Sequence, residues 1–230
     1  MKLITFQTMD ALKYLINNKE LICESKYIDI QKMGPTYKWV IEKMKEFIPN
    51  QTKSQYPIWC WVKCFNGICP PKRKGEPVKE FQVKITFHKD EKEVFITDFR
   101  RYSFLLNNVY IPNSLKEKEE FDKKLKKMKI TPKELEMYVR PDKYKSHRLD
   151  KEYLAICEEI QNTFDRCITK DSNILQGCVW NIKLSEVENI EILTNDGYRY
   201  GSLNYKRSNG ERINWQKEFY KLLKLGVKYE

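Results

Sequence analysis

The segment from Ile174 to Ile182 constrains the fold more than any other part of the sequence. Within it, Cys178, Trp180 and Ile182 alternate with their neighbours at the two-residue period of a strand that buries one face. Gln176 stands near the start of this strand, beside a glycine, where a ligand can approach the backbone closely. We therefore expect chemistry first at the side-chain amide of Gln176.

Strand and helix patterns fill most of the remaining chain. Apolar patterns predict further strands at 2–7, 20–23, 56–62, 79–88, 93–97 and 190–194. Helical spacing predicts helices at 9–16, 37–48, 99–106, 116–129, 153–166 and 214–223. We expect 79–88 and 93–97 to form a hairpin, and 190–194 to pair with the strand that follows Ile174. This order predicts an α+β fold in a single domain, residues 1–230, with a mixed β-sheet and a basic helical insertion at 114–151.

The net charge of +11 favours a partner that carries negative charge, such as RNA or a nucleoprotein complex. The 32 acidic residues are interspersed with the 43 basic ones, so a solvated, lysine-rich surface is the alternative. The basic excess is densest in the helical insertion. The candidate partner-binding residues there are Lys123, Lys124, Lys126, Lys127, Arg140, Lys143, Lys145 and Arg148.

The cysteines and histidines give little support for a metal centre. Cys60, Cys64 and Cys69 contain no Cys-x-x-Cys pair, and the chain has only two histidines, so no metal is expected. Seven cysteines at mostly apolar positions indicate a reducing compartment. No signal peptide or run of about 20 apolar residues is visible. We expect a cytoplasmic protein of a bacterium or of one of its viruses.

Several short patterns resemble a family of uncharacterised bacterial and phage proteins known only as a domain of unknown function. The resemblance runs in order over most of the chain and implies no established activity. Tyr102 departs from it, because the pattern has Trp there. The patterns are Leu3-Ile4-Thr5-Phe6-Gln7-Thr8, Tyr37-Lys38-Trp39, Pro57-Ile58-Trp59-Cys60-Trp61, Thr97-Asp98-Phe99 with Leu106-Asn107, and Gln176-Gly177-Cys178-Val179-Trp180.

The opening, Leu3 to Leu21, also resembles the ADP-ribosyltransferase superfamily, which implies a split sheet and NAD as the cofactor. By that resemblance Thr5 takes the place of a histidine, and Gln176 takes the place of the catalytic glutamate. A neutral amide would lack the electrostatic stabilisation that a carboxylate gives to developing positive charge. The residues that would surround NAD are Thr5, Gln7, Tyr37, Trp59, Trp61 and Trp180, and the three tryptophans are of a type that stacks on flat rings.

Two functions from different classes therefore remain open. The first is an NAD-binding protein, with ADP-ribose transfer to nucleic acid or protein as its reaction and Gln176 as its catalytic position. The second is a non-enzymatic protein of a phage or mobile element, resembling an anti-CRISPR protein, that binds RNA or a nucleoprotein through its basic surface. The sequence does not indicate an oligomeric state.

Overall fold

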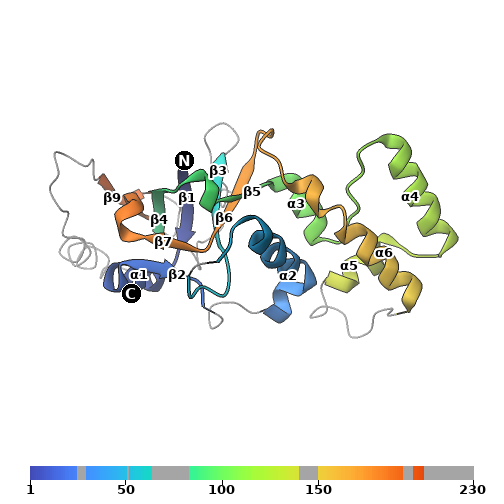
Figure 1. Cartoon of the computed structure of the whole chain (residues 1–230), viewed down its shortest axis with the longest axis horizontal. Helices are drawn as coiled ribbons and strands as arrows, with labels where there is room; N and C mark the ends of the chain where they lie inside the picture. The colour runs from blue at the N-terminus through green and yellow to red at the C-terminus, as the bar shows by residue number, and fades with distance from the viewer. Residues whose placement is uncertain (25–29, 51, 64–82, 140–149, 194–198, 205–230) are drawn as a thin grey trace. The chain divides into compact units, whose positions relative to one another are not determined.

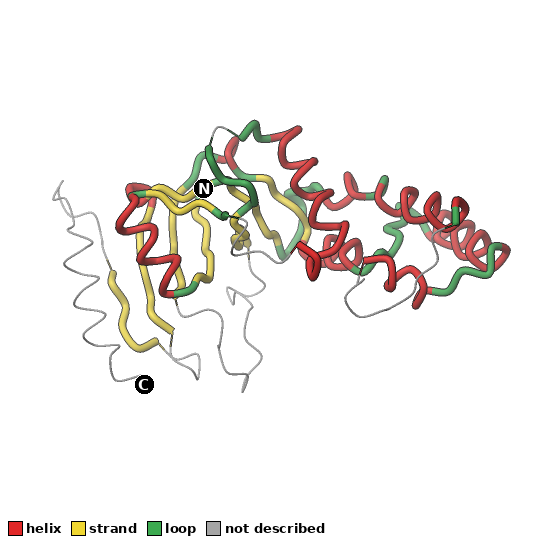
Figure 2. The backbone as a smooth tube through the Cα atoms, turned by 90° about the horizontal axis from the view of Figure 1, so that it is seen from below, coloured by secondary structure: helices red, strands yellow, loops and turns green. Residues whose placement is uncertain are grey.

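The computed structural model describes residues 1–24, 30–50, 52–63, 83–139, 150–193 and 199–204. The chain divides into two compact units. Unit 1 comprises Met1–Cys23, Thr52–Val94 and Cys178–Glu230, and unit 2 comprises Glu24–Gln51 and Phe95–Gly177. Most of the described strands belong to unit 1 and most of the described helices to unit 2 (Figures 1 and 2). The fold is α+β, as predicted.

Unit 1 is built on an antiparallel sheet with β1 and β4 at its centre. The strand order is β3-β1-β4-β8-β9. β1 pairs along its whole length with β4, from Lys2 opposite His88 to Gln7 opposite Val83. β1 meets β3 on its other edge, where Ile4 lies opposite Trp61. The strands are β1 (Lys2–Gln7), β3 (Ile58–Lys63), β4 (Val83–His88), β8 (Val187–Leu193) and β9 (Arg199–Asn204).

One face of this sheet forms the core of unit 1. Leu3, Ile85 and Phe87 are fully buried there, because facing residues on paired strands point to the same side of the sheet. Helix α1 (Met9–Asn18) lies along the sheet (Figure 2), with Leu12 and Leu15 fully buried. Its spacing of apolar residues therefore matches the helical period that the sequence predicted.

Local signals set both ends of α1. The Thr8 hydroxyl accepts a hydrogen bond from the Ala11 amide at 3.1 Å and satisfies one free donor of the first turn. The helix stops at Lys19, whose φ of 64° lies in the left-handed region. The chain then enters β2 (Glu20–Ile22), which pairs with β7 (Asn181–Lys183) in a small second sheet.

Unit 2 is mainly helical, and side-chain caps start several of its helices. Asp98, Ser114 and Asp150 each accept a hydrogen bond from the amide three residues further on. The elements are α2 (Ile30–Phe47), β5 (Phe95–Asp98), α3 (Phe99–Leu106), α4 (Leu115–Lys127), α5 (Pro132–Val139), α6 (Lys151–Gln161), the 3-10 helix η4 (Phe164–Cys167) and the start of β6 (Leu175–Val179).

Aromatic side chains fill the core of unit 2. The Phe164 ring lies parallel to Phe95, with centroids 6.2 Å apart, and edge-on to Tyr102 at 6.1 Å. Buried Asn108, with a φ of 55°, lies in the turn after α3 and links α5 to α6, because its side-chain nitrogen donates to the Leu135 carbonyl and to the Cys157 sulfur. Tyr102, the position that departs from the family pattern, is therefore a core residue.

The segment after Ile174 differs from the prediction. It contains two short strands, β6 and β7, and every residue from Leu175 to Ile182 is buried, so the expected wet face is absent. The prediction that this segment pairs with 190–194 is also wrong, because β8 pairs with β4 and β9. When a strand is buried on both faces, apolar and polar residues do not alternate along it, so its sequence does not indicate which strand it pairs with.

Two further predictions need correction. The hairpin of 79–88 with 93–97 is wrong, because β4 has β1 on one edge and β8 on the other and has no edge left for β5. Helix α2 begins at Ile30 rather than at Tyr37, since its backbone continues through Gly34 and Pro35. The predicted helix at 214–223 lies outside the described residues.

Candidate nucleic-acid interface

Gln176, the residue from which we expected chemistry, is used inside unit 2. Its side chain is buried, with 7% exposure, and its Nε2 donates to the Thr97 Oγ1 at 3.2 Å. Both partners come from neighbouring strands, β5 and β6. This hydrogen bond between neighbouring strands gives the Gln176 side chain a structural role.

Thr5 and Gln7 form a short hydrogen-bonded chain in unit 1. The Thr5 hydroxyl donates to the Trp59 carbonyl at 2.7 Å and accepts from the Gln7 Nε2 at 2.8 Å. Thr5 is 1% exposed, whereas Gln7 is half-buried at the end of β1. Among the described residues, the Gln7 side-chain oxygen has no hydrogen-bond partner, so it is the group of this pair that can meet a ligand.

The aromatic residues predicted around NAD do not share one surface. Because Trp61 lies opposite Ile4, the half-exposed side chains of Trp59 and Trp61 lie on the sheet face opposite Thr5 and Gln7. Tyr37 in unit 2 and Trp180 in unit 1 are buried core residues, with 2% and 3% exposure.

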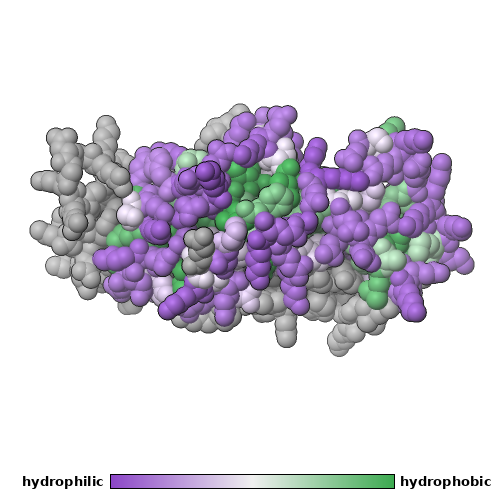
Figure 3. All heavy atoms as spheres, viewed as in Figure 1, coloured by the Kyte–Doolittle hydropathy of each residue, from purple (hydrophilic) through white to green (hydrophobic). Residues whose placement is uncertain are grey.

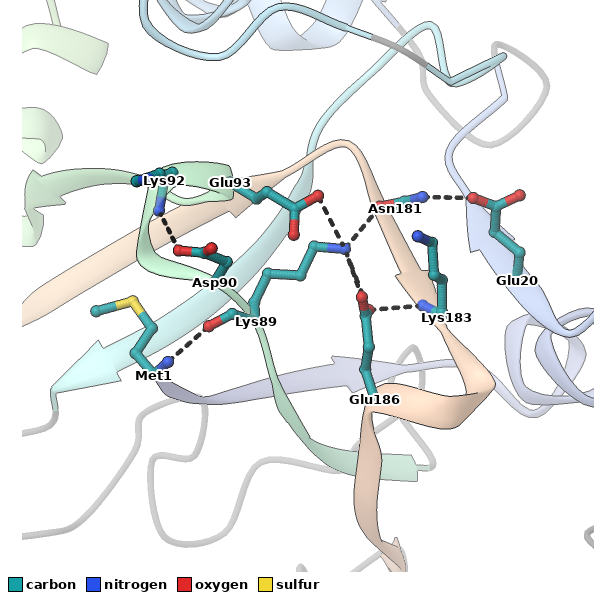
Figure 4. Close-up of polar contacts among 9 residues, drawn as sticks. All are labelled: Met1, Glu20, Lys89, Asp90, Lys92, Glu93, Asn181, Lys183 and Glu186. Carbon is teal, nitrogen blue, oxygen red and sulfur yellow. Dashed lines mark hydrogen bonds and ion pairs between the residues drawn. The ribbon is translucent and has the colours of Figure 1, made fainter.

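A buried lysine, which we did not predict, organises one end of unit 1 (Figure 4). The Lys89 side chain is 1% exposed, and its ammonium donates to the Asn181 Oδ1 at 2.8 Å and to both Glu186 oxygens at 2.9 and 3.1 Å. Asn181 in turn donates to Glu20, and Glu186 also accepts from the Lys183 amide at 2.8 Å. These contacts hold β2, β7 and the end of β4 together, which is a structural role.

Helix α4 in unit 2 is anchored firmly at its first turn. Glu117 accepts hydrogen bonds from the Tyr110 hydroxyl, from the Asn113 amide and from Arg166. These donors, that of Tyr110 first, lower the pKa of Glu117 to about 2. Phe121 stacks on the Tyr110 ring, with centroids 4.0 Å apart. The amino-terminal half of α4 is therefore fixed on the body of unit 2.

The lysines of that first half are balanced by acids on the same helix. Lys116 lies 3.9 Å from Glu120, and Lys118 lies 2.7 Å from Asp122, both at the i,i+4 spacing that favours ion pairs. Further along the helix, Lys124 pairs with Glu159 of α6. Predicted as a partner-binding residue, Lys124 is therefore engaged within the protein.

The end of α4 carries lysines without such partners. They are exposed, and among the described residues no acidic side chain pairs with them. Figure 3 shows a mainly hydrophilic surface over α4. Lysines also suit the carboxyl end of a helix because of its dipole, so their position has a structural reason too. We call this set the basic end of α4: Lys123, Lys126, Lys127 and Lys129.

Other predicted residues cannot be placed. Arg140, Lys143, Lys145 and Arg148 lie outside the described residues. Within the described ranges, no group of three or more histidine, cysteine or acidic side chains is arranged to hold a metal ion. Nor does any helix in those ranges combine the length and apolar character needed to cross a bilayer.

The fold and this surface define an α+β protein with an unbalanced basic helix end. The chain belongs to the family described as Domain of unknown function (DUF3841), whose model matches residues 2–188. The resemblance noted in the sequence is thus confirmed over β1 to the start of β8. Comparison with curated proteins gave no significant match, and neither did comparison with solved structures.

Proposed function

We propose that this protein binds RNA, by its phosphate backbone, through the basic end of α4. The observation that supports this most is the uneven charge along the helix. Lysines in the first half have acidic partners within one turn, whereas Lys123, Lys126 and Lys127 have none among the described residues. Unpaired lysines attract phosphates and release counterions when they bind them.

The spacing of these lysines supports the same proposal. Residues three and four apart lie on one side of a helix, so Lys123, Lys126 and Lys127 present their ammonium groups together. The anchoring of the first half of α4 through Glu117 and Phe121 holds the helix in place without using these lysines. RNA binding therefore needs no rearrangement of the contacts that keep α4 folded.

Replacing Lys126 and Lys127 with glutamine tests the proposal. At about 0.1 M salt each lost phosphate contact weakens single-strand binding roughly 5-fold, so the double variant is expected to bind about 25-fold more weakly. The measurement is fluorescence anisotropy with a short labelled RNA of mixed sequence.

The matched control replaces Lys116 and Lys118 with glutamine. It removes the same charge from the same helix, but from lysines that already have acidic partners. Its RNA affinity should stay within about 2-fold of the wild type. Equal losses in the two double variants, or no binding of RNA by the wild type, would contradict the proposal.

As a second proposal, unit 1 binds a nucleotide such as NAD beside Gln7. The supporting observation is the hydrogen bond from the Gln7 Nε2 to the Thr5 hydroxyl, which fixes the Gln7 side chain. The Gln7 Oε1 can then accept a hydrogen bond from a ribose hydroxyl or a carboxamide. The resemblance of Leu3 to Leu21 to the opening of ADP-ribosyltransferases supports it as well. Transfer of ADP-ribose is not part of this proposal, because Gln176 is neutral and bonded to Thr97.

Calorimetric titration with NAD tests this second proposal. Loss of the one hydrogen bond in the Gln7→Ala variant is expected to raise the dissociation constant about 5-fold, the equivalent of ~1 kcal/mol. Gln55→Ala is the control, because Gln55 is an exposed residue of the same unit. An absence of heat with the wild-type protein, together with no thermal shift, would rule the proposal out.

A further inference from the structure

Helix α3 exposes a large aromatic side chain, Phe104. Phe104 is 55% exposed, although it lies in the last turn of a helix that Asp98 caps. Val109, whose amide donates to the Phe104 carbonyl at 3.0 Å, is 45% exposed beside it. By contrast Phe47, exposed to a similar degree, packs its ring 5.6 Å from Phe95. Phe104 has no ring partner among the residues that the structure describes.

A cationic side chain, Arg100, accompanies Phe104 on helix α3. Arg100 precedes it by four residues, so both lie on the same side of α3. Arg100 is exposed, and no acidic group pairs with its guanidinium within the described parts of the chain. Its neighbour Arg101 is engaged, since it donates to the Arg166 carbonyl at 2.8 Å. Of the two arginines, Arg100 is the one available to a ligand.

We propose that the RNA is bound single-stranded, with an unpaired base stacked on Phe104 and the adjacent phosphate held by Arg100. Every base presents a flat face, and stacking on an aromatic ring needs a base that is not already stacked in a duplex. A protein partner would match the exposed apolar pair equally well. The Arg100 guanidinium lies one turn away, has no acidic partner in the described part of the chain, and belongs to the unit that carries the basic end of α4; these features favour a polyanion.

The inference rests on the proposed RNA binding and adds the strandedness of the ligand. Lysines that contact only phosphates give no such preference, because both single strands and duplexes carry phosphates. A side chain that stacks on an unpaired base does give a preference for single-stranded RNA. The two contributions can therefore be separated by variants that remove one and keep the other.

The test compares Phe104→Ala, Phe104→Trp and wild type on a labelled single-stranded RNA and on the same RNA annealed to its complement. We expect wild type to prefer the single strand, and Phe104→Ala to bind it about 10-fold more weakly with little change for the duplex. Phe104→Trp should restore the single-strand affinity. Phe47→Ala is the control and should bind as wild type does.

Two results would overturn the inference while leaving the proposed function intact. In the first, the Lys126 and Lys127 double variant loses affinity but Phe104→Ala binds the single strand as tightly as wild type, so that Phe104 serves another partner, such as a protein. In the second, wild type binds the duplex at least as tightly as the single strand. If wild type binds neither RNA, the proposed function itself fails, and this inference fails with it.

Discussion

Replacing Lys89 with methionine is expected to lower the free energy of unfolding by about 3 kcal/mol. Methionine fills a similar volume, so the loss comes from the acceptors that are left without the ammonium. The Glu186 carboxylate and the Asn181 oxygen would remain in a largely buried site without a donor of equal strength. Glu186 keeps 18% exposure, which places the effect near the lower end of the usual range for buried pairs.

Urea denaturation of three variants checks this result. Adding Glu186→Gln to Lys89→Met should recover part of the lost stability, because it removes the uncompensated charge. Lys92→Met, an exposed lysine on the neighbouring turn, should change the stability by less than about 0.5 kcal/mol. If Lys89→Met is no less stable than Lys92→Met, the buried ion pair is not what holds this end of unit 1.

Replacing Phe164 with alanine should also cost about 3–5 kcal/mol. The side chain is 1% exposed and packs against Phe95 and Tyr102, so its removal leaves a cavity in the core of unit 2. The surrounding rings belong to a strand and to helix α3, and such a framework relaxes only partly into a void.

Phe104→Ala is the matched control for this second prediction, because it deletes the same side chain from an exposed position. Its stability should stay within about 0.5 kcal/mol of the wild type in the same urea experiment. Equal destabilisation by the two alanines would contradict the described core, and it would also remove Phe104 as a candidate binding residue.

Much of the local structure could be predicted from the sequence because its signals are local. The helices predicted at 9–16, 99–106 and 153–166 correspond to α1, α3 and α6, and the side chains of Thr8, Asp98 and Asp150 cap them by accepting an amide hydrogen bond. The segment 79–88 was likewise predicted as a strand, and in β4 its apolar residues Val83, Ile85 and Phe87 are buried, although Thr86 is buried as well. Strand partners were predicted poorly, since pairing depends on residues far apart in the chain, as when β1 joins β4.

The candidate interface could be predicted only in part, for the same reason. The lysine density of α4 is visible in the sequence, but that Lys124 pairs with Glu159 depends on how α4 and α6 pack. The burial of Lys89 could have been predicted, because Lys89 follows Ile85 and Phe87 at the same two-residue spacing and both of those residues are buried. Phe104 had none, since its helical spacing did not reveal that the side chain is 55% exposed.

The salt dependence of single-stranded RNA binding tests the central claim most directly. If the four lysines at the basic end of α4 contact phosphates, the slope of log K against log salt should be about −2.8 or steeper for wild type. The slope should become less steep by roughly 1.4 when Lys126 and Lys127 are glutamine. The control with Lys116 and Lys118 replaced should keep the wild-type slope. A wild-type slope near zero, or the same change in both variants, would contradict binding through the basic end of α4.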